Sequence, residues 1–187
     1  TARGQWVVLP AALFCTGEWL LPTGDIELNI PIDAVYKPQR VRGIDTFLKG
    51  RRSRFGGNPI PHQSFMFEVM KRRSEVRAYA LVADHTPKHN EEKHWTTFLH
   101  QDTAFFVGAD KIAKIVKAPV IYVAMRRDGP GRYVVELSLL AEPPYDRDSG
   151  PEIVERYARK LEEEIRRSPA DWLWLNRKWK YRKPLYS

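Results

Sequence analysis

The chain has 187 residues, of which 43% are hydrophobic and 29% charged, so it is long enough for one globular domain with a hydrophobic core. No apolar run approaches the ~18–20 residues that span a bilayer, and no signal peptide is visible. The single cysteine, Cys15, excludes an internal disulfide and a zinc site of several cysteines, and it fits a reducing compartment.

The charge balance favours an acidic partner, because 31 Lys and Arg against 23 Asp and Glu give a net charge of +8. Nucleic acid, anionic lipid head groups, phosphorylated substrates and an acidic carrier protein all fit this balance. The six tryptophans, which lie near Lys and Arg, suit a membrane interface, or else they close the core. A basic nucleic-acid-binding protein is the alternative of another class. No stacking platform or known motif supports it, so we expect no nucleic acid partner.

The first half of the chain alternates between strand and helix patterns. The apolar run at residues 6–12 predicts a buried strand, and shorter extended segments are predicted at 33–36 and 58–61. The nearly continuous apolar run at 77–83 predicts a strand covered on both faces. Helices are predicted at 42–53, where Ile44, Phe47 and Leu48 share a face, and at 63–73, where Met66, Val69 and Met70 form the buried stripe.

The second half continues the alternation, with a short strand predicted at 95–99. Strands at 119–125 and 133–140 are predicted to pair across the turn at 128–131. This order predicts an α/β fold with a mixed, mostly parallel sheet flanked by helices. Two helices are predicted here: 104–117, capped by Asp102 or Thr103 and lined by Phe105, Ala109, Ile112 and Val116, and 151–167, lined by Val154, Tyr157, Ala158, Leu161 and Ile165.

Polar residues follow several of these predicted elements. Glu18 follows the first strand, Arg52 and Arg54 lie at the end of a helix, and Asp84 with His85 follows the central strand. Because parallel strands end at one edge of a sheet, these side chains are predicted to lie on the same edge. Arginine binds phosphate through two hydrogen bonds, and carboxylates orient or deprotonate a donor, so the set suits an anionic substrate.

Short motifs occur in a fixed order along the chain. They are Tyr36-Lys37-Pro38, Arg52-Ser53-Arg54-Phe55-Gly56, Asp84-His85-Thr86-Pro87, Trp95-Thr96-Thr97-Phe98-Leu99, Gln101-Asp102-Thr103, Gly108-Ala109-Asp110-Lys111-Ile112-Ala113 and the tail from Pro169 to Lys180. In this order they resemble the lipid A biosynthesis lauroyl/myristoyl acyltransferases, which are late acyltransferases of the lysophospholipid acyltransferase superfamily. The resemblance covers nearly the whole chain.

The resemblance implies a glycerolipid acyltransferase-like fold and a specific reaction. A fatty acyl chain would pass from acyl carrier protein, or acyl-CoA, to a hydroxyl of a phosphorylated glycolipid acceptor. The reaction would take place on the anionic cytoplasmic face of the bacterial inner membrane, to which the protein would bind peripherally. The family uses no metal or other cofactor. We expect residues 1–187 to form a single acyltransferase-like domain without the family's amino-terminal anchor region.

The resemblance also assigns roles to individual residues. The family's catalytic pair is a histidine and, five residues later, an acid that orients it. The acid falls on Glu18, but the histidine position holds Leu13, which cannot accept a proton. Arg52 and Arg54 are expected to hold phosphate or a phosphopantetheine-linked donor together with nearby lysines. Asp84 and His85 complete the expected substrate-binding set.

Leu13 leaves three interpretations open. The protein is a catalytically silent homologue that still binds lipid or carrier protein, or another histidine, His62 or His85, supplies the base. In the third interpretation, Cys15 acts as a nucleophile whose pKa is lowered near a helix N-terminus. Loss of a general base typically lowers the rate ~10²–10⁴-fold, so these interpretations differ greatly in expected activity.

Overall fold

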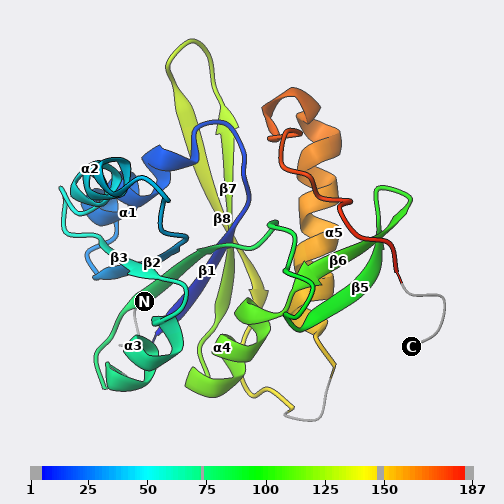
Figure 1. Cartoon of the computed structure of the whole chain (residues 1–187), viewed down its shortest axis with the longest axis horizontal. Helices are drawn as coiled ribbons and strands as arrows, with labels where there is room; N and C mark the ends of the chain where they lie inside the picture. The colour runs from blue at the N-terminus through cyan, green and yellow to red at the C-terminus, as the bar shows by residue number, and fades with distance from the viewer. Residues whose placement is uncertain (1–5, 73, 147–149, 184–187) are drawn as a thin grey trace.

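The computed structural model describes residues 6–72, 74–146 and 150–183, and its centre is a six-stranded sheet (Figure 1). The strand order is β3-β2-β4-β1-β7-β8. Five strands run parallel, and only β8 runs antiparallel, against β7. The prediction of a mixed, mostly parallel sheet is therefore confirmed. The strands are β1 (Val7–Ala11), β2 (Ile32–Tyr36), β3 (Asn58–Pro61), β4 (Ala78–Val82), β7 (Val120–Arg127) and β8 (Tyr133–Ala141).

Helices cover both faces of this sheet. On one face, α3 (Phe65–Lys71), α4 (Gly108–Val116) and α5 (Glu152–Arg167) pack over side chains such as Val8 and Val120. On the other face, Leu21 from α1 (Leu20–Glu27) packs over a smaller cluster around Leu9. All five residues of the predicted apolar stripe on α5 are buried, as expected. None of the helices in the described part of the chain is both long and apolar enough to cross a membrane.

A separate hairpin of β5 (Lys93–Phe98) and β6 (Gln101–Phe106) corrects one prediction. The helix predicted from residue 104 begins only at Gly108, and its cap position is Val107 rather than Asp102 or Thr103. Phe105 lies in β6, where its ring packs edge-on against Phe98 at 5.1 Å. A single apolar residue such as Phe105 fits both the strand repeat and the helix repeat. Its pairing with β5 therefore decided that this segment is a strand.

Two helices turn different faces to the protein than their patterns suggested. In α3, Val69 is fully buried, but Met66 and Met70 are exposed, so the predicted buried stripe of this helix was wrong. In α2 (Arg42–Arg52), no residue is buried, and Ile44 and Phe47 point to solvent. Helical spacing shows that side chains share a face, but it does not show what covers that face.

The parallel strands bring four chain exits to one edge of the sheet. The exit of β1 continues through the short 3-10 helix η1 (Gly17–Trp19), and that of β2 continues to Lys37 and α2. β3 ends at Pro61, and β4 ends before Asp84. Figure 1 shows the loops from β1 and β2 and the tail after α5 beside this edge. The predicted functional side chains belong to these exits.

Candidate functional site

The exit of β1 is held by a buried carboxylate. Asp84 is fully buried, and its Oδ2 accepts hydrogen bonds from the backbone N–H of Leu13 at 3.0 Å and from the Trp172 indole N–H at 2.9 Å. The carbonyl of Leu13 accepts a bond from the backbone N–H of Leu173 at 2.8 Å. The tail after α5 is thus bonded to the same segment. These contacts fix the backbone at Leu13 and therefore the position from which its side chain projects.

Glu18 and Arg52 form a two-point ion pair at the same edge. Arg52 Nε donates to Glu18 Oε2 at 3.0 Å, and Nη2 donates to Oε1 at 2.5 Å. The Arg52 guanidinium also lies 5.6 Å from the centre of the Tyr36 ring. Because the Glu18 side chain is 59% exposed, the pair adds little stability, but its paired geometry orients both groups. Both carboxylate oxygens of Glu18 therefore bond to an arginine.

His85 is a neutral imidazole at the end of β4. Its side chain reaches the surface, yet the atoms packed around its ring lower its pKa from the ordinary 6.5. The negative charge of Asp84 opposes this shift, and the positive charges of Lys178 and Lys37 add to it. A neutral imidazole has a free nitrogen lone pair, so His85 is able to accept a proton at pH 7.

Lys178 is a buried lysine that the sequence pattern did not single out. Only 2% of its surface is exposed, and its Nζ donates to the Ala104 carbonyl at 3.2 Å and lies 3.6 Å from the centre of the Phe105 ring. Burial lowers the pKa of Lys178 to about 7, although the charge of Asp84 acts in the opposite direction. The family resemblance includes the tail segment. Within a run of basic residues, however, the sequence gives no sign that this lysine is buried rather than solvated.

Residues 16–181 match the family model of the bacterial lipid A biosynthesis acyltransferases. The chain belongs to this family. The matched range contains Glu18, Arg52, Asp84, His85 and Lys178, and it begins after β1 and Leu13. No curated protein matches the chain. The reaction class of the family is the transfer of an acyl chain to a lipid, which the sequence resemblance predicted.

The acyltransferase interpretation considered three other residues, Arg54, His62 and Cys15. Arg54 follows α2, with its guanidinium 5.8 Å from the Phe55 ring, and the described contacts do not join it to Glu18. The backbone of His62 donates to the Tyr36 carbonyl at 2.9 Å, which places it at the end of β3. Burial and the neighbouring Asp171 raise the pKa of the Cys15 thiol, and this disfavours the thiolate that a nucleophile needs.

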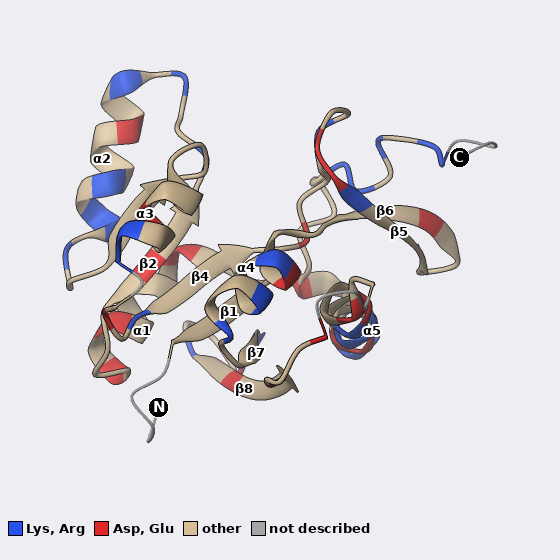
Figure 2. Cartoon of the chain, turned by 90° about the horizontal axis from the view of Figure 1, so that it is seen from below, with Lys and Arg blue, Asp and Glu red and all other residues tan. Residues whose placement is uncertain are grey.

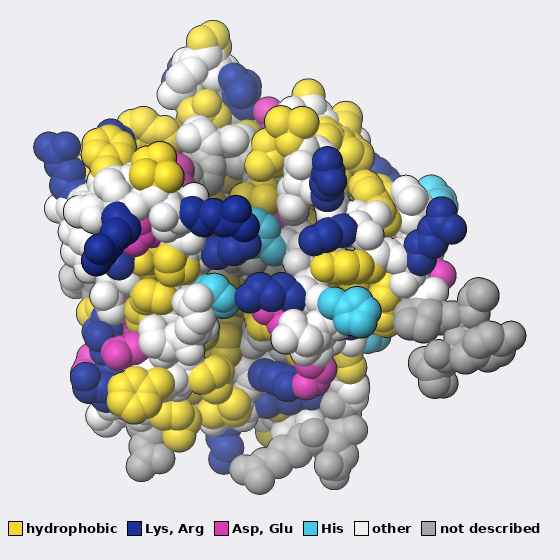
Figure 3. Space-filling model, viewed as in Figure 1, with side chains coloured by type: hydrophobic (Ala, Val, Ile, Leu, Met, Phe, Trp, Pro, Cys, Tyr) yellow, Lys and Arg dark blue, Asp and Glu magenta, His cyan; other side chains and the backbone are white. Residues whose placement is uncertain are grey.

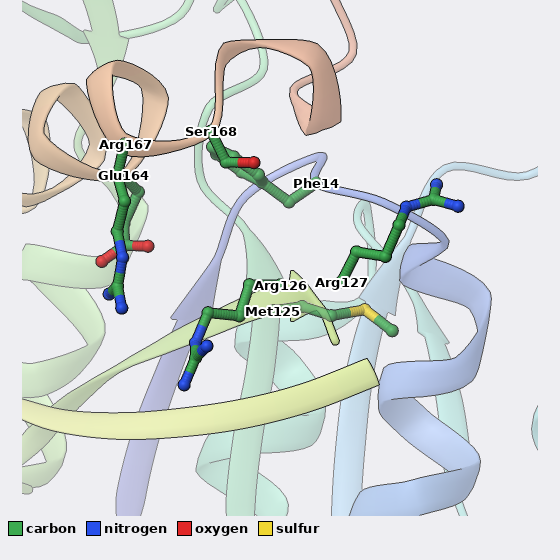
Figure 4. Close-up of a pocket in the computed structure, with 7 residues that line it drawn as sticks. All are labelled: Phe14, Met125, Arg126, Arg127, Glu164, Arg167 and Ser168. Atoms are coloured by element: carbon green, nitrogen blue, oxygen red, sulfur yellow. The ribbon is translucent and has the colours of Figure 1, made fainter. Parts of the chain in front are cut away.

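A small hollow of about 170 Å³ lies behind the β1 exit of this family member (Figure 4). Its arginines face existing carboxylates: Arg126 and Arg167 pair with Glu136, and Arg127 pairs with Asp171 at 3.5 Å. Figure 4 shows Arg126 and Arg127 pointing in opposite directions. The hollow therefore does not form a convergent anion site. It is lined by Phe14, Met125, Arg126, Arg127, Glu164, Arg167 and Ser168.

Proposed function

We propose that this chain transfers a fatty acyl group from acyl carrier protein or acyl-CoA to a hydroxyl of a phosphorylated glycolipid, at the anionic cytoplasmic surface of the bacterial inner membrane. One observation carries the proposal: in a member of the lipid A acyltransferase family, the Glu18–Arg52 pair and the Asp84–His85 pair lie on the same edge of the sheet. Residues 1–187 would act as a single domain.

The proposed proton acceptor is His85. The acceptor hydroxyl oxygen attacks the thioester carbonyl carbon, its proton passes to the imidazole, and the carbon–sulfur bond breaks to release the donor thiol after reprotonation. Leu13 has no basic atom, and the Glu18 oxygens already accept bonds from Arg52. The lowered pKa of His85 supports this assignment.

The proposed role of Arg52 is to hold phosphate. A guanidinium has five N–H donors, and Glu18 takes two of them, so donors remain for an anion. Lys37 follows Tyr36, whose ring lies under Arg52. The charge of Lys37 acts on His85. Lys37 would therefore add positive charge between the two pairs, with Arg54 at the outer end of α2. Because Asp84 is buried, its proposed contribution is to position the β1 exit rather than to touch substrate.

A catalytically silent homologue is the second candidate, and Leu13 favours it. The Glu18–Arg52 pair fits this candidate as well, because an orienting acid without a histidine is free to bind arginine. Such a protein would keep the donor or lipid site without turnover. The two candidates differ in what happens when the missing base is supplied.

Thioester consumption with acyl carrier protein and acyl-CoA donors and a phosphorylated glycolipid acceptor distinguishes them. We expect His85→Gln to lower the rate ~10²–10⁴-fold, as loss of a general base does. The matched variant His62→Gln should keep the wild-type rate. The wild-type rate should decrease as the pH is lowered through the pKa of His85, which lies under 6.5. Activity that appears only in Leu13→His would establish the silent homologue, and no turnover in either protein would refute acyl transfer.

A further inference from the structure

The helix α2 has its polar side toward the protein and its apolar side toward solvent. On the inner side, Asp45 accepts a bond from the Gln39 backbone N–H at 2.8 Å, and Arg52 pairs with Glu18. On the outer side, Val41, Ile44 and Phe47 follow helical spacing. Between 51% and 62% of the surface of each of these three is exposed. An apolar stripe that the protein itself leaves exposed marks a site of interaction with another surface.

Arginines surround this apolar stripe. Arg40 and Arg42 lie at its start, and Arg51 lies one turn beyond Phe47, with its guanidinium 5.9 Å from the Phe47 ring. Among the described residues, none of these three arginines forms an ion pair with a carboxylate. Figure 2 shows the basic positions along α2, and Figure 3 shows hydrophobic and basic side chains together over this region. We name the six residues the α2 surface: Arg40, Val41, Arg42, Ile44, Phe47 and Arg51.

A hollow of about 410 Å³ lies beside the α2 surface and is lined in part by Arg40, Val41 and Ile44. Lys37 also lines this hollow, and its positive charge acts on His85. The hollow combines basic and apolar groups, as a phosphate attached to an acyl chain requires. It is lined by Lys37, Pro38, Gln39, Arg40, Val41 and Ile44.

A second exposed apolar segment is attached to the same β1 exit. The Leu173 backbone bonds to Leu13, and Trp174 and Leu175, which follow it, are 51% and 88% exposed. The α2 surface is attached to this exit through the Glu18–Arg52 pair. Two apolar projections beside one site suit a broad, flat partner better than a narrow one such as a peptide. The unpaired arginines require that partner to be negatively charged.

We propose that the α2 surface docks on an anionic lipid bilayer, with Val41, Ile44 and Phe47 inserted among the acyl chains and Arg40, Arg42 and Arg51 at the phosphates. This arrangement is that of an interfacial amphipathic helix, which lies in the plane of the membrane. The docking proposal rests on the proposed function, in which the membrane supplies the lipid substrate. The docking would place the lipid phosphates beside Lys37 and Arg52.

Co-flotation with vesicles of phosphatidylglycerol and phosphatidylethanolamine tests the docking without any catalysis. Phe47→Glu should weaken binding about tenfold or more, because it moves a charge to the apolar side of the interface. Phe67→Glu is the matched control, since Phe67 is 70% exposed on α3, which lies well apart from α2 in Figure 1. Arg40→Gln with Arg42→Gln should weaken binding more than Arg132→Gln with Arg166→Gln, which changes the net charge equally.

The outcomes separate docking from catalysis. We expect Phe47→Glu to keep its wild-type melting temperature and its turnover of a detergent-dispersed acceptor while it fails to float. Equal flotation of Phe47→Glu and Phe67→Glu would overturn the proposal, and so would equal binding to phosphatidylcholine alone. Salt-dependent binding to mixed DNA without vesicle binding would assign the α2 surface to nucleic acid instead. A protein that docks but shows no turnover refutes only the proposed function.

Discussion

Asp84 and Lys178 are two charged side chains that the fold encloses beside the candidate site. Asp84 is fully buried, and its Oδ1 has no hydrogen-bond partner among the described residues. The burial of a charge is costly unless another charge or hydrogen bonds compensate it. The Lys178 ammonium lies near enough for the charge of Asp84 to raise its pKa, but burial has the larger effect. At the residue scale, this pair links the tail to the β1 exit through electrostatics.

The Lys178 pKa predicts how stability depends on pH. The folded pKa is about 7 and the unfolded pKa is near 10.5, so the unfolded chain binds more protons between these values. The free energy of unfolding should therefore rise with pH by up to about 1.4 kcal/mol per pH unit between about 7.5 and 9.5. Lys178→Met should remove this slope, and Lys71→Met, on exposed α3, should keep it. Urea unfolding at several pH values measures the slopes, and parallel curves for wild type and Lys178→Met would contradict the assignment.

The connection from α2 to β3 is the element that positions Arg52. At Gly57, an added Cβ would lie 2.5 Å from Asp25 Oδ2 and 2.7 Å from the Arg52 backbone oxygen. The chain therefore packs against its own helix end at this point, and only glycine leaves enough space. Gly57 thus contacts the backbone of the residue whose side chain pairs with Glu18.

Gly57→Ala should destabilise the protein by ~1–3 kcal/mol, because overpacking displaces the backbone. It should also weaken phosphate-dependent donor binding, since the Arg52 backbone has to move. Gly50→Ala is the matched control within α2, where an added Cβ meets nothing within 4 Å. That change should stabilise the helix by ~0.5–1 kcal/mol. Thermal unfolding measures both effects, and equal melting temperatures for the two variants would show that the space at Gly57 is not needed.

Elements differ in how well their sequence predicts them. The stripe on α5 was confirmed because a strongly amphipathic helix of 16 residues leaves few alternatives for its buried face. The boundary between β6 and α4 was wrong because Phe105 fits both periods and is buried by the hairpin. The exposed faces of α2 and α3 were missed because a local pattern does not specify the surface that meets it.

The largest hydrophobic cluster joins parts of the chain that are far apart in sequence. Phe14 from the β1 exit, Phe98 from the hairpin, Leu161 from α5 and Trp172 from the tail all belong to it. The Phe98 ring lies 6.2 Å from Trp172 and 6.3 Å from Trp179. Because one cluster is shared by the sheet, the hairpin and the tail, the hairpin and the tail pack into the same core as this part of the sheet. At the scale of the whole molecule, this supports the proposed single domain.

Unfolding should therefore occur in one cooperative transition. Far-UV circular dichroism reports the sheet and helices, while half of the tryptophan fluorescence probes, Trp172, Trp174 and Trp179, lie in the tail. The two denaturant curves should coincide in wild type. Trp172→Phe removes the indole bond to Asp84 and should shift both curves together to lower denaturant, by ~1–3 kcal/mol. An earlier fluorescence transition would show that the tail unfolds independently, against a single domain.

The sequence by itself determined the alternation of strands and helices, the parallel class of the sheet and, through its ordered motifs, the acyltransferase family. These features depend on local periodicity and short motifs, which adjacent residues encode. Only the tertiary structure decided that Glu18 meets Arg52, which is 34 positions later, and that Lys178 is buried near Asp84. Pairing and burial depend on which distant segments share a surface, and pKa values follow from the solvent that this packing removes.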